Sequence, residues 1–432
     1  MKLYHIIPSF LIAVIAVMAP GCSNNQEDFF DDPASIRMQQ MLDNTKRVLI
    51  SSPNGWALDY YPDRNLSYGG YAYVISFNDT HATVGAEIKP GEFCTSLYKM
   101  TDDNGPVLSF DSYNEIMHYF AKPDSENPHA HDGDFEFIIL DVKDDVIKLR
   151  GKRTGNDMYM YRLDRPAAEY LNDVMDMVHD ICLPDLVGSV GSTSMTGLIA
   201  PDTRYMTLSW GNNQVAEYFV PTDNGIRFLK PVLIEGKEIT GLKYSHREMT
   251  YTAINNEAPS ISLTHVVGED YILYEDIVGT YDLIYQNGAS SLRVELKPVA
   301  DRTSFLMSGL NPNYDVEVTY DRSKGWPLFH SQQIATDYAG DERVLVWFTC
   351  KENGGKYSVN TGCGMYAKPD MANRGTYNLE PNEYATVHAN SFYIAQIKSL
   401  DYISNLDGDA AEKWRIDGKN DIDHVIALKK VQ

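Results

Sequence analysis

The sequence has few of the features that mark nucleic-acid-binding proteins or the common hydrolases. Lysine and arginine number 37 against 60 aspartates and glutamates, so the net charge is -23. A field of this sign repels phosphate backbones, which argues against a nucleic-acid partner. The H-E-x-x-H pattern of zinc hydrolases is absent. The serine-rich stretch GSVGSTSMTG near Ser189 also lacks the G-x-S-x-G elbow of serine hydrolases.

Cysteine is scarce, with five residues in a chain of 432. One lies near the N-terminus, and the other four are Cys94, Cys182, Cys350 and Cys363. None has the spacing of metal ligands, and a large domain does not need disulfide bonds to fold, so we expect four buried free thiols. The turn ENGGK would pair Cys350 with a residue near Ser358, which argues against a disulfide bond to Cys363.

The N-terminus carries an export signal. Lys2 precedes the apolar run IIPSFLIAVIAVMAP, which is too short for a comfortable membrane span and ends at Gly21-Cys22. This pattern resembles a bacterial lipoprotein signal peptide at residues 1–21, although Ala19 stands where such signals usually have leucine. The resemblance implies that Cys22 is the lipid attachment site. The alternative is an ordinary secretory signal with an incidental cysteine.

Residues 22–33 form a polar, acidic tether. Such a tether resembles those of surface-exposed lipoproteins of the Bacteroidetes, and the absence of aspartate directly after Cys22 resembles outer-membrane sorting. We therefore expect a protein anchored by its N-terminal lipid in the cell outer membrane and exposed at the surface.

The body of the chain has the composition of a folded protein, with 43% hydrophobic and 22% charged residues, and its length favours two domains, with three as the alternative. Tyrosine is frequent, with 29 residues, and suits β-strands. Alternating patterns predict a hairpin from YAYVISF and HATVGAEI and a meander from DFEFIILDV, VIKLRGK and MYMYRL. The predicted fold class is mainly β with a few helices (α+β), built from antiparallel meander sheets or barrels.

Two domains follow from this pattern. Residues 34–262 are expected to form an N-terminal β-rich domain with helices near 34–51, 111–121 and 165–182. Residues 275–432 read as successive short strands, which predicts a β-sandwich or an antiparallel barrel similar to small lipocalin-like domains of Bacteroidetes lipoproteins. A polar stretch at 366–390, broken by proline, glycine and asparagine, is expected to be a long exposed loop.

Three segments carry a more specific resemblance. They are GPVLSFDSYNEIMHYFAKP, GDFEF and IKLRGKRTGNDMYM. Together they resemble a group of Bacteroidetes outer-membrane lipoproteins known only as a domain of unknown function. Genes of this group often lie beside those for starch-utilisation-type import proteins and a zinc metallohydrolase lipoprotein. The resemblance implies an accessory surface lipoprotein and assigns no reaction.

The stretch PHAHDGDF is the densest set of metal-ligand side chains. It holds His129, His131, Asp132 and Asp134, and two imidazoles with carboxylates are able to bind zinc. Pro128 and Gly133, however, indicate a loop, and the sequence pattern identifies no distant third ligand. We therefore interpret the stretch as a solvated loop, keep these residues as weak metal candidates, and expect no catalytic residue and no cofactor.

Aromatic residues offer a binding alternative. Some aromatic side chains are able to stack on a sugar ring or a peptide side chain. They are Trp56, Trp210, Trp326, Trp347 and Trp414, with Tyr68, Tyr71 and Tyr73. Any single one of them is better explained as a core or sheet-face residue. Only an exposed cluster would favour binding.

These observations give three functional hypotheses. The first is a non-catalytic surface lipoprotein that captures a glycan or peptide nutrient for import. The second is a structural partner of an outer-membrane import complex, which requires a flat apolar patch. The third is a metal-dependent hydrolase that uses the His129 loop, which requires distant ligands to converge there.

The lipoprotein hypothesis makes a direct prediction. Mass spectrometry of the mature protein from its native envelope should find an acylated amino end at Cys22, because the thiol of the lipobox cysteine receives the lipid. An unacylated amino end would leave only the ordinary secretory reading.

Overall fold

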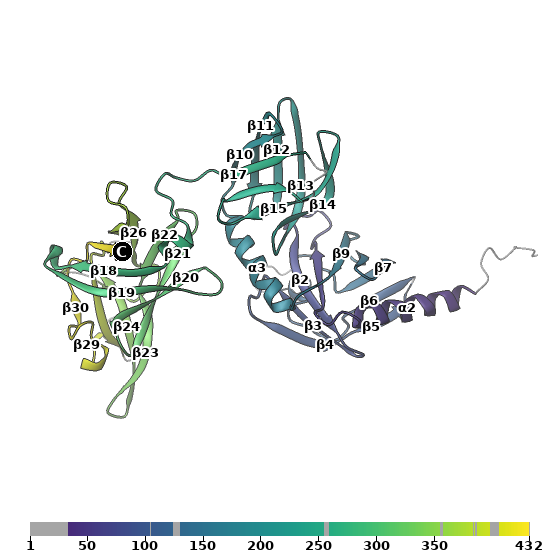
Figure 1. Cartoon of the computed structure of the whole chain (residues 1–432). Coiled ribbons are helices and arrows are strands. Elements are labelled where there is room, and N and C mark those ends of the chain that lie inside the picture. Colours follow the sequence, from purple (N-terminus) through teal and green to yellow (C-terminus); the bar gives the residue numbers. More distant parts are fainter. Residues whose placement is uncertain are drawn as a thin grey trace, which may run out of the picture.

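The computed structural model describes residues 33–103, 105–123, 130–254, 259–354, 357–382, 384, 387–397 and 406–431. The expected signal peptide, Cys22 and the tether up to residue 32 lie outside this range. The described chain is mainly β, with antiparallel sheets and barrels and few helices, so the predicted fold class is confirmed (Figure 1). None of the helices in the described segments combines the length and apolar character needed to cross a bilayer.

The first body is a nine-stranded antiparallel sheet in the order β4-β3-β2-β1-β9-β8-β7-β6-β5. Its strands are β1 (Trp56–Tyr60), β2 (Tyr71–Phe77), β3 (His81–Ala86), β4 (Phe93–Leu97), β5 (Lys99–Asp102), β6 (Pro106–Ser109), β7 (Glu136–Val142), β8 (Val146–Gly151) and β9 (Asp157–Arg162). The predicted hairpin is β2-β3 and the predicted meander is β7-β8-β9, so both are confirmed.

The nine-stranded sheet is curled. Its two edge strands, β4 and β5, are consecutive in the chain and are joined by Tyr98 alone. Since one residue spans only a few ångströms, the two edges of the sheet must meet there. Helix α2 (Ala34–Ile50) contacts β2 as well as β5 and β6, and the indole of Trp56 donates to the carbonyl of Leu49 at 2.9 Å. The sheet therefore wraps around α2, with Trp56 facing inward.

The outer face of the sheet is covered by helix α3 (Ala167–Asp180) and by the second body. The strand period of two places Trp56 and Leu58 inside and Asp59 outside. All residues of β1 are nevertheless buried, because both faces of this strand are covered. A carboxylate at position 59 therefore lies within an interface.

The second body is a closed antiparallel barrel with its own core. Its strands are β10 (Asp185–Val190), β11 (Thr193–Ala200), β12 (Tyr205–Trp210), β13 (Asn213–Thr222), β14 (Gly225–Ile234), β15 (Lys237–Ser245), β16 (Thr250–Ala253) and β17 (Ile261–His265). Figure 1 shows the barrel standing on the curled sheet beside α3. The region 34–262, expected as one β-rich domain, thus contains two β bodies, because the barrel closes on itself and does not extend the sheet.

The third body is the C-terminal domain, which follows α4 (Tyr274–Ile277). Its closed barrel consists of β18 (Gly279–Tyr285), β19 (Ser290–Pro298), β20 (Ser304–Asn311), β21 (Tyr314–Asp321), β22 (Trp326–His330), β26 (Gly364–Pro369), β27 (Thr376–Pro381) and β31 (Ala427–Lys430). A further sheet holds β23 (Gln332–Ala339), β24 (Glu342–Lys351), β25 (Tyr357–Ser358), β28 (Ser391–Ile397), β29 (Leu406–Asp409) and β30 (Asp421–Ile422). Both share one core. Of the two predicted architectures, the barrel is the one formed.

The segment 366–390 was expected to be a long loop, and this prediction is wrong. It contains most of β26 and all of β27, which pair with each other and close the barrel through β31. Ala367 and Tyr377 are buried in the core. The turn residues that suggested a loop occupy the short connection at 370–375, where Gly375 has φ +82°.

The helix expected at 111–121 is reduced to turns and a 3-10 helix, η1 (Tyr119–Ala121). The helical stretch begins at Asn114, whose side-chain oxygen accepts the backbone N–H groups two and three residues ahead, at 3.2 and 3.0 Å, as a helix N-cap does. The amide of Asn114 donates to the carbonyl of Cys94 at 2.9 Å. The stretch ends at Lys122, whose backbone is extended because Pro123 follows it. The other two expected helices are α2 and α3.

All four cysteines in the described part of the chain are free. Cys350 pairs with Ser358 across β24 and β25, as the register of the turn predicts. Cys350 and Cys363 are buried, but Cys94 is half-buried and Cys182 is exposed, which corrects the expectation of four buried thiols. Cys182 lies two residues after the end of α3.

Ion pairs dock the C-terminal domain on α3. The guanidinium of Arg322 pairs with the carboxylate of Asp180, and Arg302 reaches Asp176 at 3.4 Å. His246 of the second body also contacts Asp180, at 2.6 Å. Burial by itself would raise the pKa of Asp180, but the bond from His246 and the charge of Arg322 lower it on balance. The three bodies thus meet at one buried carboxylate.

We predict that Arg322→Met loosens this docking. Asp180 and Arg322 are only 4% and 9% exposed. Removing one partner of a buried pair costs about 3–5 kcal/mol, and the contact with His246 places the expected loss near the lower end. Small-angle scattering should show a larger radius of gyration for the variant. Arg293→Met, which breaks the exposed pair with Asp282, should change nothing measurable.

The same docking should depend on pH. Folding lowers the pKa of Asp180 below its value of 3.8 in the unfolded chain. The ionised carboxylate therefore stabilises the native state at pH values above 3.8, and this stabilisation is lost as the pH falls through the lower pKa of the folded protein. The radius of gyration of the wild type should therefore increase below about pH 4, whereas that of Arg322→Met should already be increased at pH 7. Identical curves for the two proteins would contradict this role.

Candidate functional site

A pocket of about 210 Å³ lies at the seam between the curled sheet and the second body. This seam pocket is lined by Asp59, Tyr61, Tyr159, Tyr161, Arg227, Phe228, Leu229, Pro231 and Thr240. Asp59, Tyr159 and Tyr161 come from the sheet, Tyr61 directly follows β1, and β14 with β15 supplies the rest. The seam pocket therefore exists only when the two bodies are packed together.

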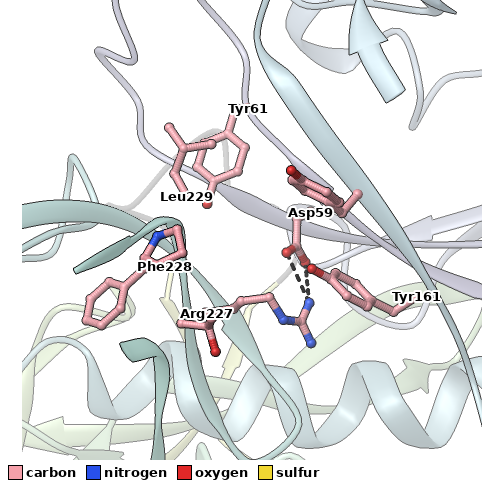
Figure 2. A pocket seen from close by; sticks show the side chains of 9 residues that line it. Asp59, Tyr61, Tyr161, Arg227, Phe228 and Leu229 are labelled. Carbon is pink, nitrogen blue, oxygen red and sulfur yellow. Dashed lines mark hydrogen bonds and ion pairs between the residues drawn. The ribbon is translucent and has the colours of Figure 1, made fainter. Parts of the chain in front are cut away.

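An ion pair forms the polar wall of the seam pocket. Arg227 Nη1 donates to both carboxylate oxygens of Asp59, at 2.8 and 3.0 Å, and the guanidinium lies 3.8 Å from the ring centre of Tyr161. Figure 2 shows the Arg227 side chain reaching from the second body towards Asp59 and Tyr161 of the sheet. A buried charge needs such partners, since its desolvation is otherwise very costly.

The titration of this pair follows from its burial. Burial raises the pKa of Asp59, and the charge of Arg227 only partly offsets the shift. For Arg227, burial acts to lower the pKa, but the charge of Asp59 raises it on balance, so the arginine stays protonated. Burial and then the negative charge of Asp59 raise the pKa of Tyr161 to about 12, so its phenol remains neutral.

Tyrosines form the apolar wall. Tyr159 and Tyr161 alternate with methionines along β9, so both rings project from the outer face of the sheet. Their ring centres are 6.2 Å apart with planes inclined by 28°, and both side chains are half-buried. Two nearly parallel aromatic rings beside a hydrogen-bonding edge suit a ligand with one apolar face and polar groups at its rim.

A second ion pair holds the seam beside the pocket. Arg204 of the second body bonds the buried carboxylate of Glu87, donates to the carbonyl of Gly70 at 2.9 Å, and lies 4.3 Å from the ring centre of Tyr71. Each arginine therefore contacts one carboxylate and one tyrosine of the sheet. The two pairs set the position of the barrel on the sheet, and hence the width of the seam pocket.

The loop of the metal candidates has a different role. His129 lies outside the described residues. The ring of His131 packs edge-on against Tyr68 with ring centres 4.5 Å apart, and Asp132 pairs with Arg153. Asp134 is buried and accepts hydrogen bonds from the backbone and hydroxyl of Thr154. Within the described segments, no group of three histidine, cysteine, aspartate or glutamate side chains gathers in a way that suits a metal ion.

The tryptophans considered for binding are placed elsewhere. Trp56, Trp210 and Trp347 are buried, whereas Trp326 and Trp414 are half-buried and donate to Asp270 and Asp337. Of the tyrosines considered, Tyr73 is buried, Tyr71 is half-buried in β2, and Tyr68 is half-buried in the connection between β1 and β2. None of these eight residues lines the seam pocket.

Sequence reasoning thus missed the residues of the seam pocket. One signal was present: Asp59 lies in the strand WALDY, whose other residues are largely apolar. A carboxylate within a strand buried on both faces requires a cationic partner. Its partner Arg227 lies 168 positions away, so nothing in the local pattern identifies it.

We predict that Asp59→Asn lowers the free energy of unfolding by about 3 kcal/mol, because Arg227, whose side chain is only 25% exposed, then has no counterion in the seam. Chemical denaturation measures this loss. The double variant Asp59→Leu with Arg227→Met should recover most of it, since no charge then remains in the seam.

The matched control is Asp157→Asn on β9. Asp157 pairs with Lys148 and Arg150 on the open surface, and its loss should cost at most about 1 kcal/mol. Equal losses for Asp59→Asn and Asp157→Asn would contradict a special role for the buried pair.

Comparisons with known proteins give families but no activity. Residues 26–246 match the family described as "Domain of unknown function (DUF4302)", and residues 254–395 match a second family, DUF4987, described as "Domain of unknown function". No match was found among curated proteins. The β subunit of a DNA polymerase from Streptococcus pyogenes aligns with a TM-score of 0.11 and 10% identity over 72% of this chain and 93% of that chain, which is too weak a likeness to carry any argument.

Proposed function

Since the chain belongs to the DUF4302 family, whose description assigns no activity, we propose a function from the seam pocket itself. The protein is a non-catalytic accessory that captures a glycan or peptide nutrient at the cell surface. The observation that carries this proposal is the pair of half-buried rings, Tyr159 and Tyr161, beside the guanidinium of Arg227. Aromatic faces with a few fixed polar groups are typical of small-ligand sites.

The chemistry of the lining favours binding over catalysis. Glycoside hydrolysis needs two carboxyl groups on either side of the scissile bond. Asp59 is the sole carboxylate among the described residues of the seam pocket, and both of its oxygens are engaged by Arg227. The pocket offers no histidine, cysteine or serine as a nucleophile or base either. A metal-dependent hydrolase gains no support from the seam pocket.

Location and partners belong to the same proposal. The leader and the acidic tether support a lipid anchor at Cys22 in the outer membrane of a member of the Bacteroidetes, with the body at the surface. Capture there would serve starch-utilisation-type import proteins, to which the chain would present its ligand. The net charge of -23 argues against nucleic acid as a partner.

A structural role in an import complex is the second candidate. Three exposed apolar residues lie around Asp185 of β10. Leu198 is its partner across the β10–β11 pair, Val266 donates its backbone N–H to the carbonyl of Asp185, and Val187 lies two residues further along β10. Leu198, Val266 and Val187 are 53%, 51% and 51% exposed. These apolar side chains surround a charged residue, so the patch is small, and this candidate ranks behind ligand capture.

We predict that Tyr159→Ala weakens ligand binding about tenfold, because it removes one of the two aromatic faces. The measurement is an array of glycans and peptides probed with the full mature chain, followed by calorimetry on the best ligand. Tyr205→Ala is the control. Tyr205 is also half-buried and packs on a second tyrosine, Tyr218, at 4.7 Å, but it does not line the seam pocket.

Binding by the wild type that survives Tyr159→Ala unchanged would move the site elsewhere. An array on which the wild type binds neither glycans nor peptides would contradict capture altogether.

A further inference from the structure

Tyr61 presents a buried hydroxyl without a hydrogen-bond partner. Its side chain lines the seam pocket and is 2% exposed, and no donor or acceptor of the described protein reaches its hydroxyl oxygen. Burial, followed by the charge of Asp59, raises the pKa of Tyr61 well above its usual value, so the hydroxyl stays a neutral donor and acceptor. A buried polar group left unpaired carries a penalty that a bound ligand or water removes.

Arg227 presents a second set of unused hydrogen-bond donors. Only Nη1 bonds Asp59, at 2.8 and 3.0 Å. A guanidinium carries five N–H donors in a planar fork, and those on Nε and Nη2 find no acceptor among the described residues. Stacking on Tyr161 fixes the plane of the fork, so these donors keep a defined direction.

The seam pocket has no net charge with which to bind a charged ligand. Asp59 neutralises Arg227, and the other residues of the lining are tyrosine, phenylalanine, leucine, proline and threonine. A ligand carboxylate or ammonium group would lose its hydration without gaining a counterion. The pocket volume of about 210 Å³ is also below the range of about 300–1,000 Å³ that is typical of sites for drug-sized ligands. It suits a single ring-sized group.

From these observations we propose that the seam pocket binds one uncharged sugar ring at the end of a glycan. Tyr159 and Tyr161 contact the C–H face of the ring. The hydroxyl of Tyr61 and the unused donors of Arg227 bond sugar hydroxyl groups, which both donate and accept. This assignment rests on the proposed capture function and selects, of its two nutrient classes, the glycan.

Tyr61→Phe tests the assignment, because it deletes only the hydroxyl. The probes are glucose, galactose, mannose, xylose and N-acetylglucosamine, each as an immobilised neutral oligosaccharide, with glucuronic acid oligosaccharides and short peptides on the same array. We expect the full mature chain to bind a neutral oligosaccharide and to bind its uronic acid counterpart at least about tenfold more weakly. Tyr61→Phe should weaken binding about tenfold, while its melting temperature stays the same or rises because an unpaired buried hydroxyl is gone.

A second tyrosine provides the matched control. Tyr251 is 0% exposed and its hydroxyl also lacks a partner, but it lies in the core of the second body outside the seam pocket. Tyr251→Phe should therefore leave the affinity unchanged.

The remaining outcomes separate the two proposals. If a peptide or an acidic glycan binds and Tyr159→Ala weakens it, capture stands and the neutral-sugar assignment is overturned. If a neutral glycan binds equally well to the wild type and Tyr61→Phe, the role of the hydroxyl is overturned. If the wild type binds nothing on the array, the capture function itself fails.

Discussion

The arrangement of the N-terminal half depends on two arginines of the second body, Arg204 and Arg227, each held between a carboxylate and a tyrosine of the curled sheet. Both carboxylates, Glu87 and Asp59, are buried, so any shifted packing would leave a buried negative charge unpaired. The two pairs determine how the barrel sits on the sheet. The seam pocket is a consequence of that packing and not a feature of either body alone.

Pairs of arginine and carboxylate also hold the third body. Arg322 and Arg302 reach the carboxylates of Asp180 and Asp176 on α3, the helix that also packs on the sheet and on β13. Tyrosine rings accompany these ion pairs too, since Arg302 lies 5.7 Å from the ring centre of Tyr274 and Arg322 lies 5.8 Å from that of Tyr320.

The local parts of this fold could be predicted from the sequence. The β2-β3 hairpin, the β7-β8-β9 meander and helix α3 follow from the periods of two and 3.6, which short segments display by themselves. The errors have local causes as well. The helix expected at 111–121 starts only at Asn114 and ends before Pro123, and the turn residues at 370–375 concealed the two short strands that they join, β26 and β27.

The candidate site could not be predicted in the same way. The histidine loop is a metal candidate in the sequence because its ligand-type residues are close together there. In the structure, Asp134 bonds Thr154 and His131 packs on Tyr68. The seam pocket joins segments that are up to 168 residues apart. No single segment reveals that the outer face of β9 will meet β14. Only the buried aspartate in β1 indicated that a cationic partner had to exist.

We infer that the seam between the sheet and the barrel is a ligand site. Hydrogen–deuterium exchange on the full mature chain, with and without saturating neutral oligosaccharides, tests it most directly. We predict slower exchange in the strands that line the pocket, above all in β9, Asp157–Arg162, and β14, Gly225–Ile234. Unchanged exchange in both strands, with protection appearing instead in the loop at 130–135 or the turn at 370–375, would contradict it.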